Sequence, residues 1–209
     1  MNAFLNGLMI SGSIIIAIGA QNAFVLKQGL LKQNVGIVVF LCWFCDCILM
    51  SFGVLGVGAL IADSHIATMI LALTGGLFLL GYGVNSAKRA WRGGGHISVN
   101  ASNTNQPASA LKAATTTLML TLLNPHVYVD TLMLIGGSAV TLSTSDKLLF
   151  LIGALLASAI WFIGIGYGAR FLLPLFRRER VWQWLDGFIA MMMFYLAYGL
   201  FKQIFPLLT

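Results

Sequence analysis

The sequence predicts an all-α integral membrane protein with six transmembrane helices arranged as a 3+3 inverted repeat. Composition is the first observation: 59% of the 209 residues are hydrophobic and only 9% are charged, whereas a soluble domain carries about 25% charged residues. Long runs with one charge or none are the second, since a helix needs about 20 apolar residues to cross a bilayer. A polar stretch that divides the runs into two sets of three is the third. Residues 1–209 therefore form a single transmembrane domain.

The first and last runs need separate justification. The first has no Lys or Arg between Met1 and Ile18 and is too long for a cleaved signal peptide, so a retained span is the better interpretation. The last is short, because Asp186 and Lys202 bracket it and Pro206 limits its extension. The six predicted spans cover residues 4–26, 35–61, 66–87, 113–140, 148–170 and 183–205.

The basic residues predict how these spans are oriented. Ten of the twelve Lys and Arg residues lie in the loops after spans 1, 3 and 5, and only Lys147 and Lys202 lie on the other side. Basic loops stay in the cytoplasm, so both termini are expected outside it. If the sixth segment does not cross, the C-terminus moves inside. Topology and anionic lipids explain the net charge of +6, and no nucleic-acid partner is needed.

The polar stretch, residues 88–112, is predicted to be a cytoplasmic linker, because it has too little apolar surface to fold alone. It separates half 1, residues 1–87, from half 2, residues 113–209. Three spans per half is an odd number, so related halves would cross the membrane in opposite senses, as in many secondary transporters. Residues 19–25 echo 123–129, and residues 80–83 echo 196–199. Alternatively, small and aromatic residues simply recur in a helical bundle.

Asp46 and Asp130 are the most informative residues, since each stands alone within an apolar span. An acidic side chain at mid-bilayer depth costs about 2.5 kcal/mol or more. Such a group usually faces a water-filled cavity, a charged partner or a substrate path. We therefore expect the functional site to surround these two positions.

Polar residues within spans 1 and 4 predict breaks in both helices. Gln21 and Asn22 place two amides in an apolar segment, and Pro125 after Asn124 removes a backbone donor. Membrane helices tolerate such breaks where the freed groups line a cavity or are buried in protein. The ends of a broken helix would suit the carboxylate and ammonium groups of an amino acid. A simple proline kink, with the amides bonded between helices, is the alternative.

Span 4 presents polar residues on two faces. Thr117, Thr121, Asn124, Tyr128 and Thr131 form one stripe, whereas His126 and Asp130 share a face about 120° away. An intact helix cannot point both groups at one cavity. Either the break reorients the second part of the span, or the two faces serve a substrate path and a separate contact. His126 is interpreted as a buried histidine or as a proton relay.

Span 2 contains Cys42, Cys45 and Cys47 around Asp46. The cluster could bind a soft metal or exchange thiols. However, no second cysteine pair is available to accept electrons, and free cysteine packs well as a small hydrophobic residue. We expect packing, with neither a metal nor a cofactor. No phosphate-binding loop motif is present either, so an ATP-driven engine within the chain is not expected.

Three segments resemble the signatures of the lysine exporter (LysE) family, in its lysine and arginine exporter branch. They are residues 19–29, Asp46 in span 2, and residues 123–131, and the similarity extends over the whole chain. Two departures are Ala20, where the family commonly has proline, and Thr74, where it tends to have tryptophan. The first departure predicts a softer break in the first helix, and both bear on substrate preference.

The resemblance implies secondary export of basic amino acids, L-arginine or L-lysine or both, across the bacterial inner membrane, without enzymatic activity. Asp46 and Asp130 would bind the cationic side chain or exchange protons. Gln21, Asn22, Asn124 and the helix ends at Pro125 would hold the α-amino and α-carboxylate groups, with Tyr128 lining the path and one half rocking against the other. Export of another amino acid or of a metal cation, and a membrane thiol-redox role, are the alternatives. The choice between arginine and lysine, a proton as coupling ion, and assembly as a homo-oligomer stay open.

Overall fold

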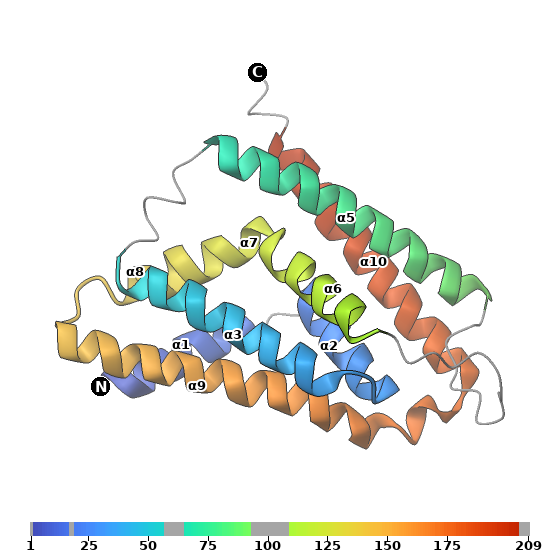
Figure 1. Ribbon diagram of the computed structural model, residues 1–209, viewed down its shortest axis with the longest axis horizontal. Helices are drawn as coiled ribbons and strands as arrows, with labels where there is room; N and C mark the ends of the chain where they lie inside the picture. The colour runs from blue at the N-terminus through green and yellow to red at the C-terminus, as the bar shows by residue number, and fades with distance from the viewer. Residues whose placement is uncertain (1, 17–18, 57–64, 93–108, 205–209) are drawn as a thin grey trace.

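The computed structural model describes residues 2–16, 19–56, 65–92 and 109–204. Within these ranges every regular element is a helix, so the all-α fold class is confirmed (Figure 1). Most of the predicted linker, the last part of the second predicted span and both chain ends lie outside the described residues.

In the part of the chain that the structure describes, three unbroken helical segments are long and apolar enough to cross a membrane. They belong to α3 (Val35–Val54), to α9 (Thr144–Gly168) with the 3₁₀ turn η2 (Ala169–Leu172), and to α10 (Glu179–Ile204), which follows a second 3₁₀ turn, η3 (Leu175–Arg177). Helix α5 (His65–Arg92) supplies the third predicted segment. Each of two bent helix pairs has, taken together, the length and apolar composition of one further span. The described part of the chain therefore has up to five spans. The integral-membrane class is confirmed, whereas the number of six and the inverted repeat stay predictions.

The first predicted span is broken into α1 (Ala3–Ile15) and α2 (Ala20–Leu31), which meet at 83°. The fourth is broken between α6 (Ala110–Leu122) and α7 (Pro125–Tyr128), with a bend of 64°. Both breaks fall where the polar residues predicted them. Gly19, the residue before α2, has an extended backbone; the softer break expected from Ala20, relative to the family's proline, stays a prediction.

A π-helix follows the second break. Helix α7 continues into η1 (Val129–Ile135), which is π-helical, and then into the short α8 (Gly136–Ser138). A π-helix bonds residue i to residue i+5 and is common at functional sites. It brings residues five apart, such as Asp130 and Ile135, onto one face.

The most extensive helix contacts join elements from different halves of the sequence. Helix α5 packs along α10, and α1 and α3 both pack along α9 (Figure 1). Glycine permits the closest of these approaches: a Cβ atom on Gly7 would lie 1.9 Å from the carbonyl oxygen of Phe150 on α9. The α5–α10 pair makes far fewer contacts with the rest of the bundle.

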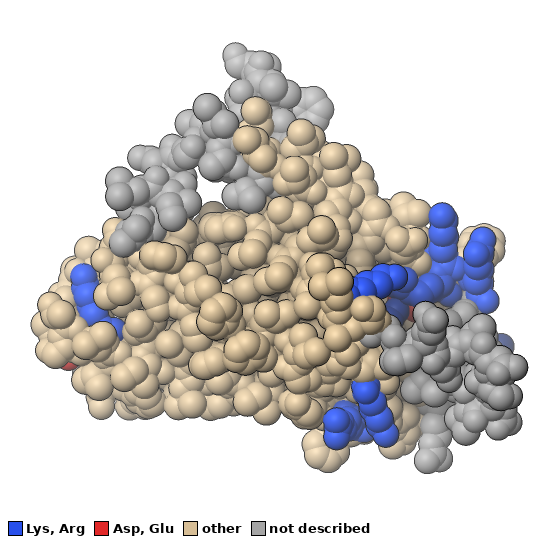
Figure 2. All heavy atoms as spheres, in the orientation of Figure 1, with Lys and Arg blue, Asp and Glu red and all other residues tan. Residues whose placement is uncertain are grey.

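Basic side chains gather at one end of the molecule. Figure 2 shows most of the visible Lys and Arg atoms over the end where α2 and α5 finish and α10 begins, with a smaller group at the opposite end. Most of the surface between the two ends has no charged residues in this view. The positive-inside rule predicts that this basic end faces the cytoplasm.

Candidate functional site

A cavity of about 180 Å³ lies where the two broken helices meet α3. Six of the eight residues singled out in the sequence line it, together with apolar residues that include Ile14, Ile15, Phe162 and Leu196. The six are Gln21, Asn22, Asp46, Asn124, His126 and Asp130. Segments that are 100 residues apart in the sequence therefore present their polar groups to one space.

Asp46 is buried on α3 and faces α9 across the bundle. The hydroxyl of Ser158 donates a hydrogen bond to the Asp46 Oδ2 atom at 2.7 Å. Ser158 is itself fully buried, so this bond is protected from water. The bond uses one of about four acceptor sites on an ionised carboxylate, which leaves acceptor capacity toward the cavity.

Asp130 lies in the first turn of the π-helix and is half-buried. His126 lies four residues earlier and lines the same cavity. The break at Asn124 and the π-helix together turn this face of the span toward the cavity, where Thr131 and Ile135 also appear. Of the two alternatives for span 4, reorientation of its second part is the one found.

Asparagines stabilise both breaks. The Asn22 amide donates to the carbonyl oxygen of Ile15, the last residue of α1, at 3.0 Å, and the Asn22 Oδ1 atom accepts from Trp161 on α9 at 3.3 Å. Asn124 accepts from the backbone N–H of His126 at 3.2 Å, which caps α7. Backbone groups freed by a break are costly in an apolar setting unless they are paired. Asn22 and Asn124 form hydrogen bonds with backbone groups at the two breaks and so stabilise the broken helices.

Gln21 and the start of α2 offer unused donors. The Gln21 Nε2 atom is buried, has no oxygen or nitrogen partner among the described residues, and lies beside the Cys42 thiol. No side chain caps the N-terminus of α2, whose first residues Ala20 and Gln21 line the cavity. A helix N-terminus carries partial positive charge and free N–H groups. This corner of the cavity is therefore suited to an anionic group.

Pro125 and Tyr128 are not among the residues that line the cavity. Pro125 is buried at the first position of α7, where its missing N–H costs nothing. The Tyr128 hydroxyl donates to the carbonyl oxygen of Leu122, the last residue of α6, at 2.8 Å. Pro125 begins the helix after the break, and Tyr128 bonds to the last residue of the helix before it. Their neighbours Asn124, His126 and Val127 line the cavity.

The three cysteines are free thiols on α3. Cys42 and Cys45 are buried, and Cys47 is half-buried. Over the residues that the structure describes, no three His, Cys, Asp or Glu side chains are placed to hold a metal ion. Cys42 belongs to the main hydrophobic cluster, which is a packing role.

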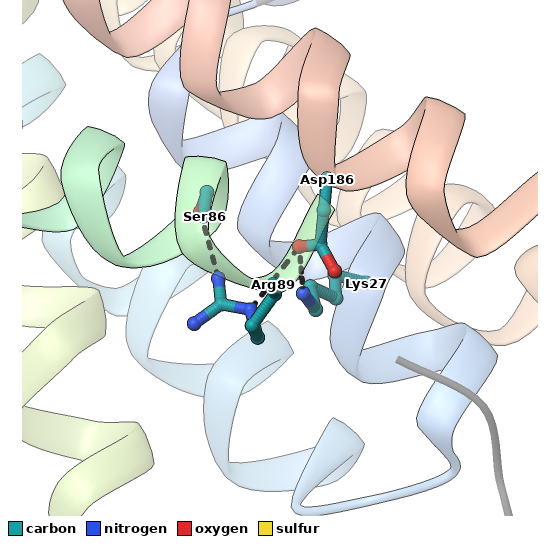
Figure 3. Close-up of polar contacts among 4 residues, drawn as sticks. All are labelled: Lys27, Ser86, Arg89 and Asp186. Atoms are coloured by element: carbon teal, nitrogen blue, oxygen red, sulfur yellow. Dashed lines mark hydrogen bonds and ion pairs between the residues drawn. The ribbon is translucent and has the colours of Figure 1, made fainter. Parts of the chain in front are cut away.

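Sequence reasoning missed a buried ion cluster near the basic end of the molecule. Lys27 on α2 pairs with Asp186 on α10, and Arg89 on α5 approaches the same Oδ1 atom at 3.3 Å (Figure 3). The Arg89 guanidinium also donates to Ser86 at 2.7 Å. The hydropathy pattern places Lys27 and Arg89 in the loops after spans 1 and 3, and Asp186 marks only the start of the last charge-free run. Residues 182, 186, 189, 193, 197 and 200 are all buried, so helical spacing in the sequence already places Asp186 on the core face of α10.

Comparisons with known proteins agree on one family. The family model described as LysE type translocator matches residues 12–203. The chain is 39% identical over 193 residues to "Putative amino-acid transporter YggA" of Aeromonas salmonicida, covering 92% of each chain. It is 38% identical over 179 residues to "Putative amino-acid transporter Mb0498" of Mycobacterium bovis, covering 85% of this chain and 86% of the relative.

No solved structure matches the chain. The matched family and the apolar helices make this a multi-pass protein of the bacterial inner membrane. The family model matches most of the chain, and the Aeromonas salmonicida relative aligns over 92% of both sequences. The chain therefore belongs to the LysE type translocator family.

Proposed function

We propose that this protein is a secondary exporter of basic amino acids, L-arginine or L-lysine or both, across the bacterial inner membrane. The family match and the relatives named as amino-acid transporters support export of an amino acid. One observation supports a basic substrate: Asp46 and Asp130, from different halves of the chain, line the same cavity. Two carboxylates in an apolar setting require a cation nearby, and a guanidinium or ammonium group would supply it.

The cavity offers a complementary place for each end of such a substrate. The uncapped N-terminus of α2 and the unpaired Gln21 amide would bind the α-carboxylate. Asn22 and Asn124, which hold the two breaks, would orient the α-amino group. The carboxylates of Asp46 and Asp130 would then take the side-chain cation. A zwitterionic backbone and a cationic side chain would thus each meet a group of opposite polarity.

Energy for export would come from an ion gradient or the membrane potential. A proton is the coupling ion that the cavity favours, because His126 and Asp130, two groups that can exchange protons, both line it. Binding of the cationic substrate would favour the ionised form of Asp130, and its release would allow a proton to return. His126 would then act as the relay between Asp130 and water.

The packing suggests which parts of the molecule move. Rocking of one intact three-helix half against the other is disfavoured, since the most extensive contacts join helices of different halves. The α5–α10 pair is the more separable body, and Leu196 on α10 forms part of the cavity wall. We infer that alternating access comes from movement of this pair against α1, α3 and α9.

Two rival functions differ in substrate. A neutral amino acid would leave the two carboxylates without a side-chain cation. A divalent metal ion requires three or more ligand atoms around a single position. Purified protein in liposomes, tested with labelled arginine, lysine, threonine and cadmium, separates these cases. Basic amino-acid export predicts transport of arginine or lysine and none of cadmium. Transport of threonine alone, or of cadmium alone, would reject the proposal.

A further inference from the structure

The ion cluster of Lys27, Arg89 and Asp186 lies between the cavity and the basic end of the molecule. On α2, Lys27 follows Gln21 by six residues, about 9 Å at 1.5 Å per residue. On α10, Asp186 precedes the cavity residue Leu196 by ten residues, or about 15 Å. Both helices run between the cavity and the basic end, so a solute that enters from the cytoplasm would pass this cluster first.

Packed side chains close this route in the structure. Phe24 and Tyr82 make an edge-to-face contact with ring centroids 6.2 Å apart, and the Arg89 guanidinium lies 5.9 Å from the centre of the Tyr82 ring. Asp186 is 0% exposed and Lys27 7% exposed. The Lys27–Asp186 ion pair therefore belongs to a set of packed, buried side chains that blocks the route.

The cluster also joins the two bodies that we infer to move. Arg89 and Asp186 both belong to the α5–α10 pair, so their contact stays within that pair. Lys27 lies on α2, and its contact with Asp186 connects the pair to the rest of the bundle (Figure 3). Separation of α10 from α2 must break this contact.

Breaking the contact has an asymmetric cost. A buried ion pair adds little net stability, but removal of one partner leaves an uncompensated buried charge, which is strongly unfavourable. When Lys27 leaves, only the partly exposed Arg89 guanidinium stays on Asp186, so separation is easier if another cation takes the place of Lys27. The Asp186 Oδ2 atom is buried and has no partner in the described part of the chain, so the carboxylate has an unused acceptor for an incoming group. A guanidinium group could use both oxygens at once.

We propose that Asp186 is the cytoplasmic entry site for the cationic side chain of the substrate, and that Lys27 and Arg89 occupy this site in the closed state. Asp186 already holds an ammonium and a guanidinium group, which are the side-chain groups of lysine and arginine. A substrate of either kind would replace Lys27 on Asp186 and release α2 from α10. A neutral amino acid has no side-chain cation for this exchange, and its α-ammonium is accompanied by an α-carboxylate that Asp186 would repel. The inference rests on the proposed function and adds a second selection step before the cavity.

Thiol accessibility tests the proposal. Ala23 is buried on α2, four residues before Lys27 on the cavity side, and A23C would report opening at the cytoplasmic end in a chain whose three natural cysteines are replaced by alanine. Inside-out vesicles would be treated with a membrane-impermeant maleimide. We expect slow alkylation that becomes about tenfold faster with lysine or arginine, a change of about 1.4 kcal/mol in the closing equilibrium. The neutral analogues norleucine and citrulline should have no effect.

Variants of the cluster separate recognition from simple closure. Asp186→Asn should give fast alkylation that no longer responds to lysine, because Lys27 loses its buried counter-charge. Exchanging the charges with Lys27→Asp and Asp186→Lys, in a chain that also carries Arg89→Gln so that no like charge faces position 186, should restore slow alkylation but not the response to lysine. Asp146→Asn, which changes a half-buried carboxylate in the first turn of α9 at the other end, is the matched control and should behave like the parent chain.

Two outcomes would overturn the inference. If the A23C chain exports arginine or lysine but its alkylation responds equally to norleucine and citrulline, the cluster does not select the cation. If Asp186→Asn leaves alkylation slow in protein that remains folded by gel filtration, the cluster does not close the path. Absence of basic amino-acid export by the unmodified protein would instead reject the proposed function, and this inference with it.

Discussion

The hydroxyl of Ser158 on α9 donates a hydrogen bond to the carboxylate of Asp46 on α3, at 2.7 Å and out of contact with solvent. The two residues come from opposite halves of the chain, and the bond fixes one oxygen of the carboxylate while the cavity lies beside it. The orientation of Asp46 thus depends on a neutral partner that brings no counter-charge.

Loss of this partner should weaken export without abolishing it. Ser158→Ala removes one hydrogen bond to a charged group, worth about 1.5–3 kcal/mol. Since 1.4 kcal/mol is a factor of ten, export of labelled arginine should fall about ten- to a hundredfold in proteoliposomes. Ser13→Ala, which removes an exposed hydroxyl bonded only to its own helix, should export normally. Full export by Ser158→Ala would show that Asp46 needs no positioning.

Asn22 should be important for folding as well as for the cavity. Asn22→Ala leaves the Ile15 carbonyl without its amide donor and the Trp161 N–H without its acceptor. An unpaired buried group costs about 1–3 kcal/mol, or roughly 2–10 °C in Tm for a chain of this size. Thermal unfolding in detergent measures the change. Ser138→Ala, at an exposed hydroxyl, should shift Tm much less, and equal shifts in the two variants would contradict the capping role.

The three cysteines should be dispensable for transport. Replacing Cys42, Cys45 and Cys47 together by alanine removes sulfur atoms from a packed helix but no ligand or nucleophile that the proposed mechanism uses. We expect modest loss of stability from the smaller side chains and most of the arginine export retained. A folded triple variant with no export would revive the metal or redox interpretation.

Much of the architecture could be predicted from single residues. The isolated carboxylates of Asp46 and Asp130 marked the cavity, because their cost in an apolar span has to be compensated. Asn22 and Pro125 marked the two helix breaks for a similar reason, since each changes how backbone groups are paired. These signals are local and chemical, and a single sequence retains them.

The remainder depends on tertiary contacts that no local pattern contains. The partnership of Ser158 with Asp46 joins residues 112 positions apart, and small hydroxyl residues are common in any membrane helix. The π-helix at Val129–Ile135 has no sequence signature that separates it from an α-helix. Lys27 and Arg89 looked like loop cations because basic residues usually remain at the membrane surface, and only the position of Asp186 on α10 reveals that they are drawn inward.

Topology provides an independent test of the basic end as the cytoplasmic one. Reporter fusions after Asn2, near Asn103 and after Thr209 should place both termini outside the cytoplasm and the linker within it. The reason is that ten of the twelve basic residues lie in the loops after spans 1, 3 and 5. A cytoplasmic C-terminus would mean that α10 does not cross and would break the inverted repeat. A cytoplasmic N-terminus with a periplasmic linker would reverse the side from which Lys27 and Asp186 are approached.

The central claim is that Asp46 and Asp130 together bind the cationic side chain of the substrate. It is tested most directly by comparing export of labelled arginine with that of citrulline, its neutral analogue, in proteoliposomes. These contain the parent protein, Asp46→Asn, Asp130→Asn or the control Asp146→Asn, which lies outside the cavity. We predict that the parent and the control export arginine and not citrulline, and that both cavity variants insert and fold but export neither. Arginine export at the parent rate by either cavity variant, or equal export of arginine and citrulline by the parent, would contradict the account.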